Sequence, residues 1–259
     1  MAISIKIAKT AKELDDVYRL RYKVYVEKEG SFKALAGKTE HIIDHFDAMP
    51  KMANIIAYSD DIPVATIRIN SDTEILLPPD ELFDFSDYRN SIANTSEKIL
   101  IVSAGMLAID TAWRNRRDVF QALFKMCADI AASWEATHIL STISIKSVSI
   151  YGRLGFTQHS DAIWIPDIGD SIVAMTNDFS TFYTWAFGQF SPDYHALIKN
   201  FSGHFEYLLT SANTTIFNAG EESIDLGGYS LSSCSNGCHD GTNWDYPNNV
   251  EFSQNIILL

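Results

Sequence analysis

The sequence is poor in cysteine and in basic residues, and it has no long apolar run. Its three cysteines are odd in number and unevenly placed, which argues against a disulfide framework and predicts reduced thiols. The 20 lysines and arginines are outnumbered by 33 acidic residues, giving a net charge of -13. A general nucleic-acid binder is therefore not expected, because phosphate binding needs an excess of basic residues on the docking face. No apolar stretch reaches the roughly 18 residues that a membrane span requires.

Apolar and aromatic residues are plentiful, at 46% and 12% of the sequence. This amount can bury one complete α/β core and leave an extension. We therefore expect a main domain over residues 1–176 and an extension over residues 177–259, where the composition changes to aromatics and then to glycine, serine and asparagine. The first residues lack a cationic leader followed by an apolar segment, which predicts a cytoplasmic protein.

The chain begins with the pattern of a strand followed by a helix. Residues 4–8 alternate like a strand, and Thr10 and Glu13 have the spacing of a capping box, which starts a helix. Apolar and aromatic residues then recur every three or four positions as far as Gly30, which we expect to end the helix. Arg21 falls among the aromatic residues of this face.

An ordered loop or lid is expected over residues 28–52, because no period is sustained there. It contains Asp44 and Asp47. Two β-rich runs follow, at residues 53–58 and 62–70, and they predict a hairpin that carries Arg68 on its second strand.

The second half of the main domain alternates strands with helices. A buried strand is expected over residues 98–109, and Gly105 inside it predicts a bulge or a close backbone approach. A helix over 119–134, a strand over 138–145 and a short helix over 146–154 follow. This order predicts a parallel strand pair, and a hairpin of residues 163–165 and 171–175 closes the domain. The fold class is thus α/β, with a mixed central sheet flanked by helices.

Two segments of this second half resemble motifs of the GCN5-related N-acetyltransferase (GNAT) superfamily. Residues 144–158 resemble its last motif, in which a tyrosine, here Tyr151, shortly precedes a Leu-Gly-Phe turn. Residues 106–119 resemble the strand and pyrophosphate loop of the same fold, although the usual glycines are missing. The resemblance implies donor binding by Leu107, Ala108, Ile109, Arg114, Arg116, Arg117, Asp118 and Val119. Partly buried core packing of Tyr151 and a solvated helix start at the three arginines are the alternatives.

The first half resembles one branch of that superfamily, the acyl-homoserine lactone autoinducer synthases and the long-chain N-acyl amino acid synthases. The residues that carry the resemblance lie in the family's order and are Arg21, Tyr25, Asp44, Asp47 and Arg68. They imply an acceptor pocket, since a buried arginine needs a carboxylate partner that can also shape an amine site. A solvated salt-bridge cluster is the alternative. The Glu and Arg pair of autoinducer synthases is replaced by residues 102–106, so adenosylmethionine binding is unsupported.

The resemblance implies an N-acyltransferase that moves a fatty acyl group from acyl carrier protein or acyl-CoA, as co-substrates, to a small amine, with no permanently bound cofactor. In this interpretation, backbone N–H groups at Gly105 polarise the thioester carbonyl and Tyr151 protonates the leaving thiolate. A water held by Asp44, Ser103 or His45 is a candidate route for the proton of the amine. An acetyl-CoA-dependent N-acetyltransferase and a catalytically inactive sensor of acyl carriers remain alternatives. Cys234, Cys238 and His239 lack the second ligand pair of a structural zinc site, so we expect no metal.

Overall fold

A computed structural model describes residues 3–36, 38–72, 76–94 and 98–187, together with the backbone of two later strands, β9 and β10. One mixed sheet organises these residues, with the strand order β10-β9-β1-β2-β3-β4-β5-β8-β6 and β7 attached to β8. The strands are β1 (Ile3–Ile7), β2 (Met52–Ser59), β3 (Ile62–Ser71), β4 (Ile101–Ile109), β5 (His138–Ser144), β6 (Thr157–Gln158), β7 (Ile163–Ile165), β8 (Asp170–Asp178), β9 (Phe205–Leu209) and β10 (Thr215–Ala219).

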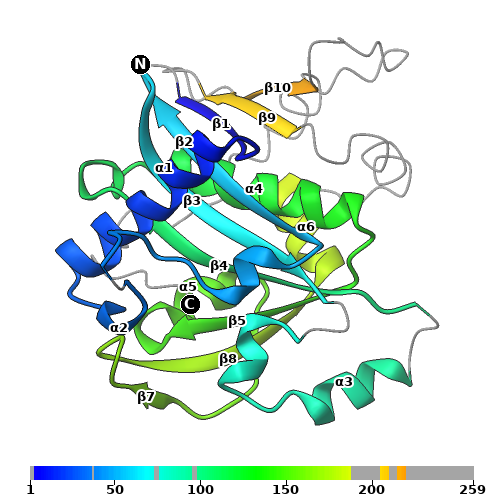
Figure 1. Cartoon of the computed structure of the whole chain (residues 1–259). Helices are drawn as coiled ribbons and strands as arrows, with labels where there is room; N and C mark the ends of the chain where they lie inside the picture. Colours follow the sequence, from blue (N-terminus) through cyan, green and yellow to red (C-terminus); the bar gives the residue numbers. More distant parts are fainter. Residues whose placement is uncertain are drawn as a thin grey trace, which may run out of the picture.

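Helices cover both faces of the sheet (Figure 1). One face carries α4 (Arg117–Ser133), α5 (Val148–Arg153) and α6 (Phe179–Phe187), which pack their apolar residues into the main core. The other face carries α1 (Ala11–Tyr22) and α3 (Ser86–Ala93), each over its own smaller cluster. The predicted α/β class with a mixed sheet between helices is therefore confirmed.

The start of α1 follows from its local sequence. Thr10 caps the helix by accepting a hydrogen bond from the Glu13 amide, and the Glu13 carboxylate accepts one in return from the Thr10 amide. The expected helix does not run unchanged to Gly30, because α1 passes into a π-helix, η1 (Lys23–Lys28). Gly30 then leaves the helix with a φ of 73°.

The β2–β3 hairpin forms where it was predicted. Its turn residues Asp60 and Asp61 both have positive φ values, 49° and 65°, as a two-residue turn between twisted strands requires. The loop expected over residues 28–52 contains two short helices, α2 (Lys33–Ala36) and the 3₁₀ turn η2 (His45–Ala48). Short 3₁₀ turns also form at η3 (Pro78–Glu81), η4 (Thr111–Trp113) and η5 (Ile145–Ser147).

The second half of the domain has the predicted order of strands and helices. The strands β4 and β5 are parallel, and β7 pairs antiparallel with β8 as the closing hairpin. The expected boundary at residues 176–177 falls inside β8, and α6 beyond it packs Phe179, Phe182 and Tyr183 into the main core. For the chain beyond α6, the division into domain and extension stays a prediction.

Candidate active site

The strands β4 and β5 pair only at their beginnings. The pairing runs from Ile101 opposite His138 to Ser103 opposite Leu140, whereas β4 continues to Ile109 and β5 to Ser144. Beyond Ser103 the two strands therefore diverge, and the edge of β4 that faces β5 is free of ladder hydrogen bonds to it. Such an edge offers backbone N–H and C=O groups to a ligand that lies between the strands.

A bulge in β4 lies at the start of this gap. Arg68 of β3 stands opposite Gly105, whereas Thr66, two residues earlier, stands opposite Ala108, so β4 contains one extra residue there. The bulge was predicted at Gly105, but the residue with the left-handed backbone is Met106, with a φ of 53°. A left-handed residue turns the neighbouring amides away from the regular ladder, which suits a site that must polarise a carbonyl.

The π-helix η1 places Tyr25 against the bulge. Its hydroxyl donates a hydrogen bond of 2.8 Å to the Leu107 carbonyl, and the side chain is fully buried. Burial raises the pKa of Tyr25, so the phenol stays neutral and keeps its donor role. Tyr25 was assigned to the acceptor pocket by sequence, and its observed contact is with the backbone of β4.

Four predicted acceptor residues form one buried ion-pair network. Arg21 Nη1 donates to both carboxylate oxygens of Asp47 at 3.0 Å, and Arg68 Nη1 lies 3.0 Å from Asp47 Oδ2. Arg68 also binds Asp44 through two nitrogens, at 2.5 and 3.0 Å. The two arginines and Asp47 are almost completely buried, and Asp44 is slightly more exposed. The sequence therefore predicted that these residues lie together. Their burial does not fit the alternative of a solvated salt-bridge cluster at the surface.

The network also fixes the loop that carries its carboxylates. Asp44 and Asp47 each accept a hydrogen bond of 3.2 Å from the other's amide, which closes the η2 turn. Burial alone would raise the pKa of Asp47, but the neighbouring Arg21 and Arg68 guanidinium groups hold it below its usual value. With two arginines against two aspartates the cluster is neutral, so its members neutralise one another before any acceptor binds.

Two asparagines that the sequence analysis missed complete this cluster. Asn54 accepts a hydrogen bond from Arg21 and donates one of 3.2 Å to Asp47, and Asn70 donates one of 2.9 Å to the Phe46 carbonyl. Both lie on the same face of the β2–β3 hairpin as Arg68. A buried amide within an apolar strand pattern was the available signal, because such a group must find a partner.

The arginines of the expected phosphate loop also have partners within the chain. Arg114 pairs with Glu29, and Arg116 pairs with Asp118 while its guanidinium lies 5.5 Å from the Trp113 ring centre. Burial raises the pKa of Glu29, and Arg114 opposes that rise. Arg117 is exposed at the first turn of α4. Docking of an anionic carrier by all three arginines stays a prediction, but two of them are partly neutralised already.

The remaining donor residues line up along β4 and the start of α4. Ala108 and Val119 are fully buried, and Leu107 is nearly so, so these side chains belong to the core, and a ligand would contact their backbone. Ile109 accepts a hydrogen bond of 3.3 Å from Arg114 Nε through its carbonyl. Ser103 is also buried, on the last paired residue of β4.

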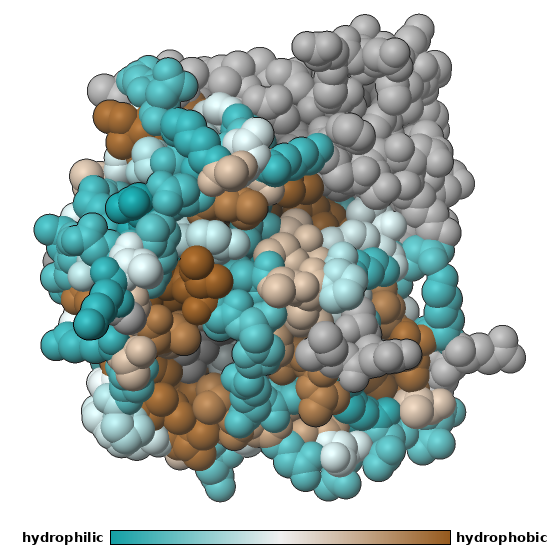
Figure 2. Space-filling view, viewed as in Figure 1, coloured by the Kyte–Doolittle hydropathy of each residue, from teal (hydrophilic) through white to brown (hydrophobic). Residues whose placement is uncertain are grey.

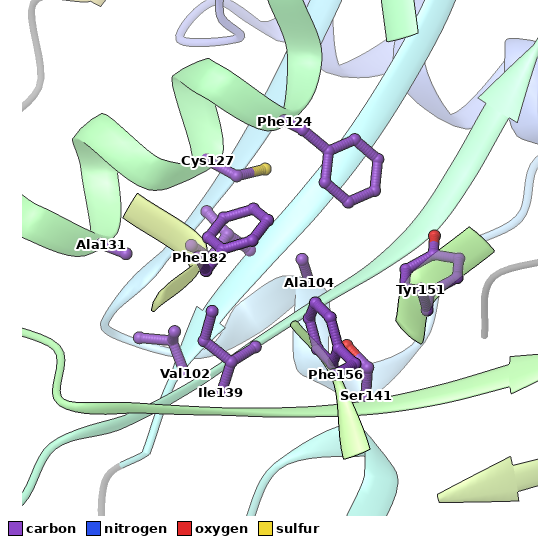
Figure 3. Close-up of a pocket in the computed structure, with 11 residues that line it drawn as sticks. Val102, Ala104, Phe124, Cys127, Ala131, Ile139, Ser141, Tyr151, Phe156 and Phe182 are labelled. Atoms are coloured by element: carbon purple, nitrogen blue, oxygen red, sulfur yellow. The ribbon is translucent and has the colours of Figure 1, made fainter. Parts of the chain in front are cut away.

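Tyr151 lies behind the gap, on the α4 side of the sheet. Its side chain is 1% exposed and its hydroxyl makes no hydrogen bond within the described residues. Burial raises its pKa well above the usual value. The Tyr151 ring lines an apolar cavity (Figure 3) together with Ile69, Val102, Ala104, Phe124, Cys127, Ala131, Ile139, Ser141, Phe156 and Phe182.

The surface around the site carries both hydrophilic and apolar regions. Figure 2 shows a mostly hydrophilic surface over α1 and apolar patches toward α2 and β7. Leu35 of α2 and Trp164 of β7 are exposed. No set of three or more His, Cys, Asp or Glu side chains in the described part of the chain is arranged to hold a metal ion. The Cys234–His239 motif lies outside the described residues. Among the helices described, none is long and apolar enough to cross a membrane.

Comparison with solved structures identifies the class of fold. FeeM, an N-acyl amino acid synthase from uncultured soil microbes, superposes with a TM-score of 0.57 at 18% identity, covering 71% of this chain and 96% of FeeM. The acyl-homoserine lactone synthase LasI gives 0.55 at 15% identity, with coverages of 73% and 96%. The CoA-dependent synthase BjaI, solved with SAM and isopentyl-CoA, gives 0.51 at 14% identity, with coverages of 77% and 100%. The chain has the GNAT-type acyltransferase fold that its motifs predicted.

The family model is more specific than the fold. The model of N-acyl amino acid synthase FeeM matches residues 16–178, which is more than half of the chain. This protein therefore belongs to the FeeM family of acyltransferases, in the branch that Arg21, Asp44 and Arg68 had indicated. No curated protein sequence matches it significantly.

Proposed function

We propose that this protein transfers a fatty acyl group from an acyl carrier protein or acyl-CoA thioester to the amine of an amino acid or a similar small acceptor. The observation that carries the proposal is the gap between β4 and β5 beyond Ser103, which opens beside an apolar cavity. The FeeM family and the acyl-homoserine lactone synthase neighbours agree with this choice of chemistry.

The gap suits the thioester arm of the donor. The arm carries amide groups, and the free edge of β4 beyond Ser103 offers matching backbone donors and acceptors. The bulge with its left-handed Met106 turns amides out of the ladder, where they can stabilise the oxyanion that forms at the thioester carbonyl. Tyr25 holds that bulge by its bond to Leu107.

The apolar lining of the cavity suits an acyl chain, but its free volume of about 10 Å³ has room for about one water molecule, so the lining side chains must move aside to admit a chain. The lining is almost entirely apolar, from β3, β4 and β5 on one side and from α4, α5 and α6 on the other. Phe182 of α6 belongs to the aromatic run that begins at Phe179. An acyl chain placed there would leave water, which favours fatty donors over acetyl by about 0.8 kcal/mol per buried methylene.

The proposed reaction is direct attack of the amine on the thioester. The amine nitrogen forms a bond to the carbonyl carbon, and the tetrahedral intermediate collapses with cleavage of the carbon–sulfur bond. Tyr151 gives its proton to the departing thiolate, the amine loses its proton to water, and a proton returned by water restores the Tyr151 phenol. Burial raises the pKa of Tyr151, which keeps the phenol protonated but also makes it a weaker acid. Proton transfer therefore requires that the thiolate leave into the same buried surroundings, where its own charge is equally unfavourable.

A donor and acceptor panel tests the proposal. Purified protein would be incubated with acetyl to palmitoyl thioesters on both acyl carrier protein and coenzyme A, together with each of the common amino acids. Mass spectrometry would then detect the N-acyl products. Formation of a long-chain N-acyl amino acid supports the proposal. Efficient transfer of acetyl alone would replace it with a small-acyl acetyltransferase, and binding without any product would indicate an inactive acyl-carrier sensor.

A further inference from the structure

Two buried hydroxyl groups on one short helix have no hydrogen-bond partner within the part of the chain that the structure describes. Ser147, at the N-cap of α5, and Tyr151, within it, are each 1% exposed, and neither hydroxyl is paired within the described residues. Ser147 and Tyr151 are four positions apart in the sequence, which places them about one turn apart on the same face of a helix. A buried hydroxyl without a partner costs stability, so two in one row need an explanation.

The position of this row relative to the gap indicates what it could bind. The strands β4 and β5 are parallel, so both finish at the same end of the sheet. At that end of the sheet, the chain runs from β4 through η4 into α4, whose first residue is Arg117. It runs from β5 through η5, whose last residue is Ser147, into α5. Tyr151 lies one turn further along α5, at the apolar cavity. In Figure 3 its hydroxyl oxygen points away from Ser141.

The order of chemical groups in the donor matches this order of residues. In a pantetheine thioester the acyl chain joins the sulfur, an ethylene group follows, and an amide comes next. If the acyl chain occupies the cavity and the sulfur lies at Tyr151, the amide reaches toward Ser147, one helical turn closer to that end of the sheet. Ser147 is then the hydroxyl that the amide satisfies.

We propose that Ser147 is a donor-binding residue whose hydroxyl pairs with the first amide of the pantetheine arm. This inference rests on the proposed function, because it takes a pantetheine thioester as the donor. It adds a residue that the sequence motifs did not single out. Ser149, on the same helix but exposed, provides the matched control.

The test compares two octanoyl thioesters that differ in the amide. Octanoyl-N-acetylcysteamine contains it, and S-ethyl octanethioate does not. Ser147→Ala should weaken binding of the first thioester about fivefold, as expected for one lost hydrogen bond, and leave binding of the second unchanged. Ser149→Ala should change neither. Calorimetry on the full chain gives both dissociation constants.

The outcomes distinguish a wrong role for Ser147 from a wrong proposed function. If the wild-type protein binds neither thioester, the donor class itself is wrong and both proposals fall. If the wild-type protein binds both thioesters, and Ser147→Ala leaves both affinities unchanged or lowers both equally, only the role of Ser147 is overturned. Thermal unfolding tests the premise independently. Removal of an unpaired hydroxyl should not lower the melting temperature, and a clear decrease would show that Ser147 is already paired.

Discussion

The Asp47 carboxylate lies between two buried guanidinium groups, 3.0 Å from a nitrogen of Arg21 on α1 and 3.0 Å from a nitrogen of Arg68 on β3. It therefore joins the helix to the sheet through the η2 loop. An ion pair in such surroundings forms only when its charges are balanced, because an unmatched buried charge is very unfavourable. The cluster therefore holds the η2 loop in place against α1 and β3.

Loss of the shared carboxylate should be strongly destabilising. Asp47→Ala leaves Arg21 without a carboxylate partner among the described residues and removes one of the two carboxylates that bind Arg68. We expect a loss of about 3–5 kcal/mol in the free energy of unfolding, measured by urea denaturation. The double change Arg21→Ala with Asp47→Ala should cost less than the sum of the single changes. Lys12→Ala, which removes an exposed pair with Asp16, is the control and should change little. Strict additivity at the buried pair would contradict the coupling.

Asp47 should also make the free energy of unfolding depend on pH in the acidic range. Its pKa is lowered in the folded state, so its contribution is complete above the unfolded-state pKa of about 3.9 and is lost as the pH falls through the lower folded value. The free energy of unfolding should therefore decline below about pH 4, whereas near neutral pH the contribution of Asp47 should be complete and should not change with pH. Asp47→Asn should flatten this acid decline. An unchanged pH profile in the variant would show that Asp47 titrates normally.

The features that the sequence predicted well are those set by neighbouring residues. Thr10 and Glu13 cap a helix because their side chains reach each other's amides over three positions. Asp60 and Asp61 form a tight turn because both tolerate a positive φ. The apolar face of α4 has a period that only a helix satisfies. The family spacing also brought Arg21, Asp47 and Arg68 together correctly.

The features that the sequence did not predict depend on contacts distant along the chain. Arg114 was expected to be available for phosphate, but Glu29 reaches it from η1. The change from α1 to a π-helix leaves the apolar periodicity nearly intact, so it has little sequence signature. The left-handed residue of the bulge is Met106 and not Gly105, because strand register, and not glycine content, fixes where the extra residue lies.

Arg117 offers the clearest test of carrier docking. It is exposed in the first turn of α4, and reversing its charge leaves the Arg114–Glu29 and Arg116–Asp118 ion pairs in place. Arg117→Glu should raise the KM for an acyl carrier protein thioester and flatten its dependence on ionic strength. Kinetics with octanoyl-N-acetylcysteamine, which has no phosphate, should be unchanged. Lys9→Glu, before α1, makes the same charge change elsewhere and is the control. Equal effects on both donors would exclude a role in docking.

Tyr151→Phe should separate chemistry from packing. The change removes a hydroxyl without a hydrogen-bond partner and keeps the ring in the cavity, so the melting temperature should not fall. Turnover should fall by about 10²- to 10⁴-fold if the phenol protonates the thiolate. Tyr58→Phe, which removes a hydroxyl bonded to Asp16 on α1, controls for loss of a phenol away from the gap. Near wild-type turnover in the Tyr151 variant would make it a packing residue only.

The length of the accepted acyl chain should depend on Ala131. This residue lines the apolar cavity from α4, whereas its neighbour Ala132 is equally buried but does not line it. Ala131→Leu fills part of the space that a long chain would occupy, so the preferred donor should become shorter while short-chain turnover is retained. Ala132→Leu should destabilise the fold to a similar degree, about 1–3 kcal/mol, without changing chain preference. The measurement is kcat/KM for a series of acyl-CoA donors, with stability recorded for each variant. If both variants shift chain preference alike, or neither does, the cavity is core packing and the acyl chain binds elsewhere.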